Sequence, residues 1–267
     1  MSLPPPSASS TCLVTGASAG IGTEFARQLA ARGYNVTLVA RRKDRLDELA
    51  AELKEQHGIK AKTIACDLSS AAARGRMLTT VKRQQLDVEV LVNNAGFGTA
   101  GRFQELDAEG ELTMVRTNVE AVVHLCSVFT KEMADRGRGA ILNVASTAAF
   151  QPIPRQTTYA ASKAFVLSFT EALGEDLHGT GVTATALCPG PVPTEFAEVA
   201  GIDEKLVNIP GVATSPADTA AAAIDGMDRG KRVVIPGLAN RAGAFAGRLA
   251  PHSLALPALR RFYPVGK

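Results

Sequence analysis

The segment Thr15-Gly16-Ala17-Ser18-Ala19-Gly20-Ile21-Gly22 stands between an apolar run over residues 11–15 and a stretch over 21–32 whose apolar residues recur at helical spacing. This pattern predicts a buried strand, a glycine-rich turn and an amphipathic helix. In such a turn, small residues let backbone N–H groups approach a pyrophosphate, and the helix N-terminus contributes partial positive charge. The sequence therefore predicts a dinucleotide site formed by Gly16, Ser18, Ala19, Gly20, Ile21 and Gly22.

The letters Gly16-Ala17-Ser18-Ala19-Gly20 also match the GxSxG turn that carries the nucleophile of α/β-hydrolases. A hydrolase would need an acid and then a late histidine, and the late histidines in this chain are His178 and His252. Neither stands in a distinctive loop signature, so the dinucleotide interpretation is favoured over hydrolysis.

Apolar, β-branched runs alternate with helical patterns along the chain, which is typical of βαβ units around a parallel sheet. Strands are predicted at 11–15, 35–40, 61–66, 88–92, 140–144, 182–187 and 232–235, and helices at 21–32, around 46–53, and at 74–85, 107–135, 157–177 and 216–227. Right-handed crossovers then give a doubly wound α/β sheet of about seven strands with helices on both faces. We expect a disordered leader over 1–9, one catalytic and dinucleotide-binding domain over 10–236, and a C-terminal extension over 237–267.

The composition excludes several classes of protein. Of the 267 residues 46% are hydrophobic and 21% charged, and the net charge of +3 is too small for a nucleic-acid-binding surface. The four cysteines form no metal-binding pattern, so we expect reduced core thiols and no metal site. No stretch approaches the roughly 18 apolar residues that span a bilayer, and the first residues lack the features of a signal peptide, so a cytoplasmic protein is expected.

The end of the second predicted strand indicates which dinucleotide binds. An NAD site places an acid about 20 residues past the glycine turn, whereas this strand ends in Arg41-Arg42. The two guanidinium groups, with Ser18, suit a 2′-phosphate, so NADP(H) is expected, with Arg41 nearer the strand tip. The alternative is that both arginines merely begin a charged helix. Asp67 and Leu68 are expected at the adenine, although Asp67 could equally cap a helix.

Candidate catalytic residues lie in the second half of the chain. Tyr159 and Lys163 are four residues apart on a predicted helix and hence on one face. Ser146 ends the fifth strand, Asn118 lies inside the long helix predicted over 107–135, and Asn93-Asn94-Ala95-Gly96 follows the fourth strand. Ser146 could instead cap a turn, and Asn118 could be a packing or bend residue. Since ligands bind beyond the carboxyl ends of such strands, these residues are expected near one site.

These motifs, with Cys188-Pro-Gly-Pro-Val-Pro-Thr194, resemble in order and spacing those of the short-chain dehydrogenase/reductase family over about residues 10–236. The resemblance implies a Rossmann-type fold, with Tyr159 as catalytic acid/base and Lys163 lowering its pKa and holding the nicotinamide ribose. It implies that Ser146 orients the substrate carbonyl and that Asn118 positions a water in a proton relay. Further cofactor contacts are implied for Asn93, Ala95, Gly96, Pro189, Gly190, Val192 and Thr194. Members commonly form dimers or tetramers through their two long helices, so a homo-oligomer is expected.

The chemistry explains why these residue types are needed. A phenol has an ordinary pKa near 10, and positive charge from Lys163 and the oxidised nicotinamide favours the phenolate of Tyr159. In the reductive direction, Tyr159 donates its proton as hydride reaches the carbonyl carbon. We therefore expect an NADPH-dependent reductase. The alternatives are an NADP-dependent dehydrogenase of a hydrophobic secondary alcohol, using the same residues, and a non-catalytic NADP-binding regulator, against which the intact Ser146, Tyr159 and Lys163 argue.

The substrate is expected to bind between the loop over 148–156 and the stretch after Thr194, because loops at the ends of strands commonly determine substrate specificity. The apolar candidates there are Phe97, Phe150, Ile153, Phe196, Val199, Ile202, Leu206 and Val207. They favour a hydrophobic ketone, aldehyde or 3-oxoacyl group, as in similar bacterial reductases. Because Pro251 and Pro257 divide the apolar and basic tail, we expect it to pack on the body or on a partner subunit, which we favour over peripheral membrane contact.

Overall fold

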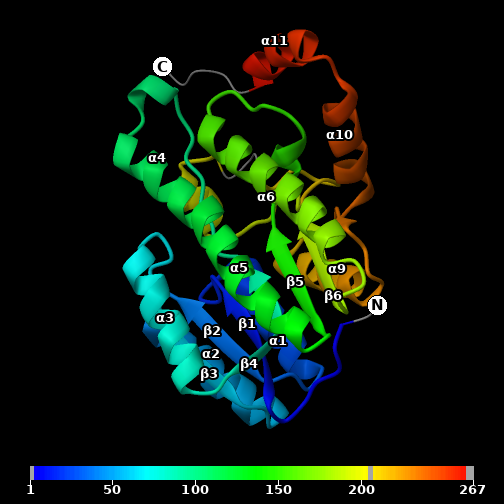
Figure 1. Cartoon of the computed structure of the whole chain (residues 1–267). Coiled ribbons are helices and arrows are strands. Elements are labelled where there is room, and N and C mark those ends of the chain that lie inside the picture. The colour runs from blue at the N-terminus through cyan, green and yellow to red at the C-terminus, as the bar shows by residue number, and fades with distance from the viewer. Residues whose placement is uncertain (1–2, 204–206, 263–267) are drawn as a thin grey trace.

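The computed structural model describes residues 3–203 and 207–262, and its centre is a parallel sheet with the strand order β3-β2-β1-β4-β5-β6-β7 (Figure 1). The strands are β1 Ser10–Thr15, β2 Val36–Ala40, β3 Ala61–Ala65, β4 Asp87–Asn93, β5 Gly139–Val144, β6 Val182–Leu187 and β7 Val233–Val234. The chain winds outward in one direction from β1 and in the other from β4. The loops after these two neighbouring strands therefore diverge, and ligands bind at such a switch point.

Helices cover both faces of the sheet. One apolar core joins the sheet to α1 Gly20–Ala31, α2 Lys43–His57 and α9 Pro216–Asp228, and the other joins it to α3 Ala71–Arg83, α5 Ala121–Asp135 and α6 Thr157–Asp176. Successive strand residues alternate between the two: Cys12 and Val14 belong to the first core and Leu13 to the second. The expected doubly wound α/β fold with seven strands is confirmed.

Local sequence signals explain where several helices begin and end. The side-chain oxygens of Ser70, Asp107 and Ser215 accept hydrogen bonds from the first backbone N–H groups of α3, α4 Ala108–Val115 and α9. α2 stops at Gly58, whose φ of 65° is the left-handed conformation that ends many helices. α3 begins at Ala71 and not at residue 74, because Ser70 supplies its cap.

The long helix expected over 107–135 is not one regular helix. It consists of α4, a π-helical turn η2 Arg116–Glu120, and α5. A π turn adds a residue to the helical repeat and changes which side chains face inward, and such turns occur frequently at functional sites. Here it brings Asn118 into the interior, which helical periodicity alone does not predict.

The first residues differ from the expectation of a disordered leader. Of the segment 1–9 the structure describes residues 3–9, and these lie against the body. Leu3 is buried in the core beside α1 and α2, and the hydroxyl of Tyr34 donates a hydrogen bond of 2.7 Å to the carbonyl oxygen of Pro4. Leu3 completes an apolar surface that the sequence pattern did not reveal.

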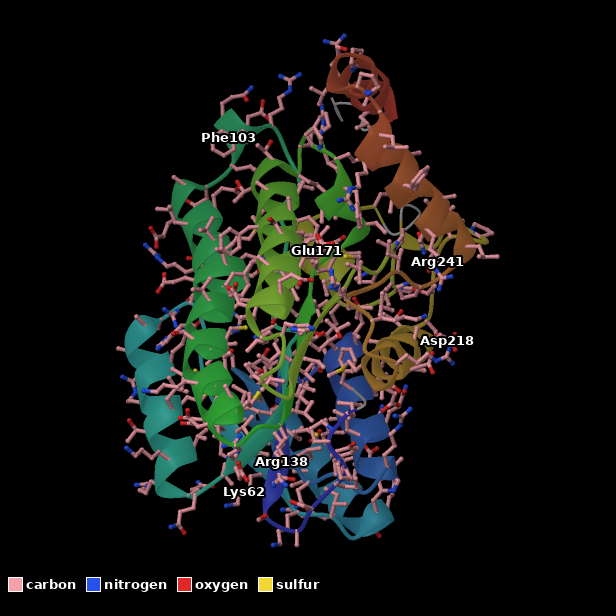
Figure 2. All side chains as sticks on the ribbon, turned by 45° about the vertical axis from the view of Figure 1, so that its right-hand side comes forward. Lys62, Phe103, Arg138, Glu171, Asp218 and Arg241 are labelled. Atoms are coloured by element: carbon pink, nitrogen blue, oxygen red, sulfur yellow. The ribbon has the colours of Figure 1, made fainter. Side chains whose placement is uncertain are left out.

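The remaining elements lie around the carboxyl ends of the strands or form the tail. They are η1 Phe103–Glu105, η3 Thr147–Phe150, α7 Phe196–Ala200, α10 Leu238–Leu249 and α11 His252–Phe262. Figure 2 shows the two ends of the molecule, with Arg138 just before β5 at one end and Phe103 after β4 at the other. Residues 263–267, the last part of the predicted extension, lie outside the described residues. Within the described ranges, no helix is long and apolar enough to cross a bilayer.

Candidate active site

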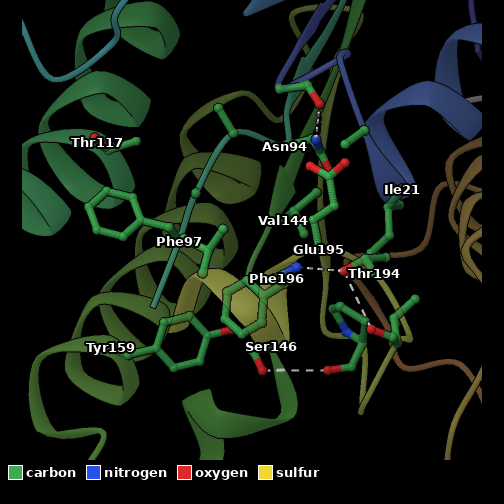
Figure 3. A pocket seen from close by; sticks show the side chains of 18 of the residues that line it. Ile21, Asn94, Phe97, Thr117, Val144, Ser146, Tyr159, Thr194, Glu195 and Phe196 are labelled. Atoms are coloured by element: carbon green, nitrogen blue, oxygen red, sulfur yellow. Dashed lines mark hydrogen bonds between the residues drawn. The ribbon is translucent and has the colours of Figure 1, made fainter. Parts of the chain in front are cut away.

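A cavity of about 600 Å³ opens at the carboxyl ends of β1, β4, β5 and β6, within the range typical of small-molecule sites. It has a polar end at the glycine turn and an apolar end beside Tyr159 (Figure 3). The expected site residues that line it are Gly16, Ser18, Ala19, Gly20, Ile21, Arg41, Arg42, Asp67, Leu68, Ala95, Gly96, Ser146, Tyr159, Lys163, Pro189, Gly190, Val192 and Thr194. Three expected site residues are not among those that line the cavity: Gly22, Asn93 and Asn118.

The glycine turn is compact because two of its glycines have no room for a side chain. Gly16 has a φ of +67°, and a Cβ there would lie 2.8 Å from Asn94 Nδ2. A Cβ on Gly22 would lie 2.2 Å from the carbonyl oxygen of Gly16. Gly22 therefore acts through close packing of α1 against the turn and not by lining the cavity. This geometry leaves the backbone at the start of α1 facing the cavity, which fits a dinucleotide pyrophosphate.

The side chain of Asn93 does not line the cavity, contrary to expectation. It is buried at the end of β4, where its amide donates to Asn143 Oδ1 at 2.8 Å. The next residue, Asn94, lines the cavity instead and donates to the backbone oxygens of Thr15 and Gly16 at 2.9 and 3.3 Å. Adjacent side chains leave a strand on opposite sides, and the motif letters alone do not tell which asparagine faces the ligand.

Arg42 joins the glycine turn to the loop after β6. Its Nε and Nη2 donate to Ser18 Oγ at 3.3 and 3.2 Å, and its Nη1 donates to Glu195 at 2.8 Å. Glu195 also accepts from Arg45, and these two hydrogen bonds, that from Arg45 first, hold the pKa of its carboxyl below its usual range. Arg41 is exposed and lines the same cavity. The positive charge expected for a 2′-phosphate is therefore present beside Ser18, and Glu195 is a partner that the sequence motifs did not reveal.

The loop after β3 is held by a buried arginine. Arg74 on α3 is only 2% exposed, and its guanidinium donates to the carbonyl oxygen of Leu68 at 2.6 Å, to Glu120, and to His124 Nδ1 at 3.3 Å. Asp67 accepts hydrogen bonds from the hydroxyl and backbone N–H of Ser69, which lower the pKa of its carboxyl. Asp67 thus shapes a turn and lines the cavity, but the cap of α3 is Ser70, so the interpretation of Asp67 as a helix cap is wrong, and its contact with adenine stays a prediction.

Tyr159 lies at the apolar end of the cavity. Its ring packs against Phe196 with the centroids 5.3 Å apart, and it is almost fully buried. Burial raises the pKa of the phenol to about 12, while hydrogen bonding with Ser146 acts in the opposite direction. Among the chain's own groups desolvation therefore dominates, and the lowering expected from Lys163 together with the oxidised nicotinamide stays a prediction.

Lys163, one helical turn after Tyr159, is 5% exposed. Its Nζ donates a hydrogen bond of 2.8 Å to the carbonyl oxygen of Val144 and lies 5.8 Å from the centroid of the Tyr159 ring. Burial lowers the pKa of this amine from 10.5 to about 8. The ammonium is thus directed at the end of β5, close to Gly96 on the loop after β4.

Ser146 follows β5 and does two things at once. Its Oγ accepts a hydrogen bond from Ala148 N at 3.1 Å, which caps η3, and donates to the carbonyl oxygen of Pro189 at 3.5 Å, while it lies near enough to Tyr159 to lower the pKa of the phenol. The capping interpretation is correct, and it fixes the hydroxyl beside the phenol. The structure therefore brings Ser146, Tyr159 and Lys163 together, from the end of β5 and from one face of α6.

Asn118 reaches the same region from the π turn without lining the cavity. Its amide donates to the carbonyl oxygen of Phe97 at 2.9 Å and to Ser162 Oγ at 3.1 Å, and its Oδ1 accepts from Phe97 N at 3.2 Å. A Cβ on Gly96 would lie 3.0 Å from Asn118 Oδ1 and 3.3 Å from Lys163 Nζ. Asn118 therefore fixes the backbone after β4 close to the ammonium.

The apolar residues expected at the substrate end fall into three groups. Phe97, Ile153, Phe196, Val199, Ile202 and Val207 line the cavity. Phe150 packs into the core between the sheet and α6 instead, because η3 turns it inward. Leu206 lies outside the described residues.

Comparison with known proteins gives consistent results. Residues 10–205 match the family of short chain dehydrogenases. A putative ketoacyl reductase of Streptomyces coelicolor is 39% identical over 211 residues, which cover 78% of this chain and 80% of that protein. A short-chain dehydrogenase from Sphingobium yanoikuyae, solved in complex with NADPH, is 34% identical, with a TM-score of 0.80 and coverage of 93% and 95%.

The bulky-bulky ketone specific alcohol dehydrogenase from Comamonas testosteroni is 29% identical, with a TM-score of 0.77 over 98% of this chain and 96% of that one. The family match covers well over half of the chain and includes the glycine turn, Ser146, Tyr159 and Lys163. This protein is therefore an oxidoreductase that belongs to the short-chain dehydrogenase family.

Proposed function

We propose that this chain is an NADPH-dependent reductase that transfers hydride to the carbonyl of a hydrophobic ketone, aldehyde or 3-oxoacyl substrate. The observation that carries the proposal is that half-buried Ser146 lies with buried Tyr159 and Lys163 at the apolar end of a cavity whose other end holds the glycine turn and two arginines. Bound NADPH supplies the hydride. The glycine turn, Arg41, Arg42 and Lys163 would hold this cofactor, and a relative solved with NADPH supports its identity.

The chain's own residues can serve the reductive direction. Because the pKa of Tyr159 is about 12, its phenol keeps its proton at neutral pH and can donate it to a carbonyl oxygen that gains negative charge. Ser146, beside the phenol, donates to the same oxygen and orients it. The ammonium of Lys163 stabilises the phenolate that remains after the transfer. Asn118 acts as a positioning residue for the backbone beside Lys163.

The substrate class follows from the lining beyond Tyr159. The walls there are phenylalanine, isoleucine and valine side chains on the loop after β4, on the loop after η3 and on the segment around α7. An apolar group that fills this end is favoured because it leaves water, whereas a highly charged substrate would lose hydration without a partner. The names of the similar ketoacyl reductase and bulky-ketone dehydrogenase support the same class.

Replacing the phenol tests the proposed acid. In Tyr159→Phe the ring and its packing on Phe196 remain, so the variant should fold and bind NADPH, but kcat for a hydrophobic ketone should fall by about 10²–10⁴-fold. The measurement is NADPH absorbance at saturating ketone. Tyr34→Phe, which removes a hydroxyl far from the cavity, is the matched control and should keep wild-type kcat. A Tyr159→Phe variant that retains a tenth of the wild-type rate would assign the acid to another group.

We also propose that Arg41 and Arg42 select NADP(H) over NAD(H) by binding the 2′-phosphate. Arg42 is the better ordered of the two, because Ser18 and Glu195 hold its guanidinium at the glycine turn. Arg41 is free to approach from the tip of β2, where it lines the cavity.

Cofactor titration by fluorescence tests this choice. With charge-assisted contacts of about 1.5 kcal/mol each, NADPH should bind up to ~100-fold more tightly than NADH, and Arg41→Ala or Arg42→Ala should each lose about tenfold for NADPH alone. Arg45→Ala is the control, since Arg45 shares Glu195 with Arg42 but is not among the residues that line the cavity. Equal affinities for the two cofactors in the wild type would contradict the proposal.

A further proposal concerns assembly and compartment. We infer a homo-oligomer, supported by exposed apolar side chains on neighbouring outer helices: Leu112 and Val115 on α4, Val123 on α5 and Phe165 on α6. These helices pack beside one another on one face of the molecule (Figure 1). A two-fold partner would bury such a face.

The four cysteines are free and buried, which supports the reducing cytoplasm as the compartment.

Light scattering at micromolar concentration measures the assembly. The wild type should have a mass of at least twice 27.9 kDa, and Phe165→Asp should shift it toward the single chain, because a carboxylate would be buried in the interface. Phe103→Asp, on the exposed η1, should leave the mass unchanged. A wild type with the mass of one chain would refute the homo-oligomer.

A further inference from the structure

The tail helix α10 has one face fixed on the body and another left exposed. On the inner face, Asn240, Ala244 and Gly247 are buried at helical spacing. The amide of Asn240 donates to the carbonyl oxygens of Val212 and Pro236, both at 2.9 Å, and Gly247 lies so close to Gln151 that a Cβ there would be 2.8 Å from its Oε1. α10 is therefore a well-held helix and not a loose end.

The outer face of α10 carries large apolar side chains in one stripe. Leu238, Phe245 and Leu249 are 82%, 66% and 64% exposed, and their spacing of seven and four residues places them on one side of the helix. Arg241 and Arg248, also seven residues apart and exposed, lie along one side of this stripe, and Arg241 Nε donates to the carbonyl oxygen of Ile235 at 2.9 Å. Contiguous exposed apolar side chains rimmed by charge mark interaction surfaces more often than ordinary solvent-facing helices.

The charge of this part of the chain indicates what the stripe meets. Asp228 is the last acid of the sequence, and the 39 residues after it hold eight Lys and Arg and no Asp or Glu. A second copy docked by the same face would bring Arg241 and Arg248 of both copies together, and neither of these two arginines has an acid as its ion-pair partner among the described residues, unlike Arg229 and Arg232. An anionic surface neutralises them, and arginines that flank an apolar stripe can extend to lipid headgroups while the leucines and phenylalanine insert below.

We propose that the outer face of α10, formed by Leu238, Phe245 and Leu249 with Arg241 and Arg248, docks on an anionic lipid surface. On the sequence alone, Pro251 and Pro257 break the tail into short helical pieces, which leave too little uninterrupted apolar face for strong membrane binding by themselves. The structure changes this argument, because Asn240 and Gly247 hold α10 folded on the body, so membrane binding does not have to order the helix.

The position of α10 relative to the cavity indicates how docking on a lipid surface would serve the enzyme. Asn240 lies against Gly190, which lines the cavity, and α10 packs against η3. Figure 1 shows α10 and α11 beside the end of the molecule to which β5 points, where the cavity opens. Docking there would bring the apolar end of the cavity near a lipid phase in which a hydrophobic carbonyl compound dissolves. This last link rests on the proposed function, whereas the docking does not.

Co-sedimentation with vesicles tests the docking without any turnover. The full chain is mixed with vesicles of phosphatidylcholine containing phosphatidylglycerol, or of phosphatidylcholine alone, at low salt. The wild type should sediment with the first and much less with the second, and added salt should release it. Phe245→Ser/Leu249→Ser should weaken the binding at least about tenfold.

Charge variants provide the matched comparison. Arg248→Glu should weaken binding to the anionic vesicles about fivefold or more, whereas Lys131→Glu, the same charge change on the exposed far part of α5, should have an effect below about twofold. All variants should bind NADPH as the wild type does, which verifies folding. Equal sedimentation with both kinds of vesicle, or undiminished binding by Phe245→Ser/Leu249→Ser, would overturn the proposal. So would a drop in the mass of that variant in lipid-free buffer, which would identify the face as a protein interface.

Discussion

The site depends on one buried hydrogen bond, from the ammonium of Lys163 to the carbonyl oxygen of Val144. Placing an amine in the interior is unfavourable unless it is well bonded, and Val144 is the last residue of β5. The bond therefore ties the first turns of α6 to the edge of the sheet. Tyr159 lies one turn before Lys163 and Ser146 lies two residues after Val144, so this one contact sets how the phenol and the hydroxyl approach each other.

The same burial tunes both titratable groups in opposite directions. Removal from water disfavours the charged form of each, so the pKa of Tyr159 rises to about 12 and that of Lys163 falls to about 8. A phenol that holds its proton is suited to donate one to a carbonyl oxygen. The loop carrying Glu195 and Phe196 completes this environment, because it touches Arg42 at one end of the cavity and Tyr159 at the other. The cofactor end and the substrate end of the cavity are thus both lined by the short segment 195–196.

Much of this arrangement could be predicted from the sequence. Alternating strand and helix patterns identify the doubly wound sheet, and parallel strands bring residues from distant segments, such as Ser18 and Ser146, to one edge. Other features depend on contacts that the sequence pattern does not contain. Which of Asn93 and Asn94 points into the cavity depends on the side of the sheet to which each side chain points at the end of β4. The burial of Asn118 depends on the π-helical turn η2. The rise of the Tyr159 pKa depends on how completely the surrounding loops exclude water. Arg74 and Glu195 were not recognised because His124, which accepts from Arg74, and Arg45, which donates to Glu195, lie far away in sequence.

The central claim is that Lys163 is a desolvated ammonium that holds the site together. Its titration in the full chain can be followed by NMR of lysine labelled at the side chain, with Lys163→Met identifying the signal. The account predicts a midpoint at about pH 8, well below the other lysines, because burial disfavours the charged amine. A midpoint near the ordinary value of 10.5 would show that water reaches the amine, and would contradict the account of how this site is built.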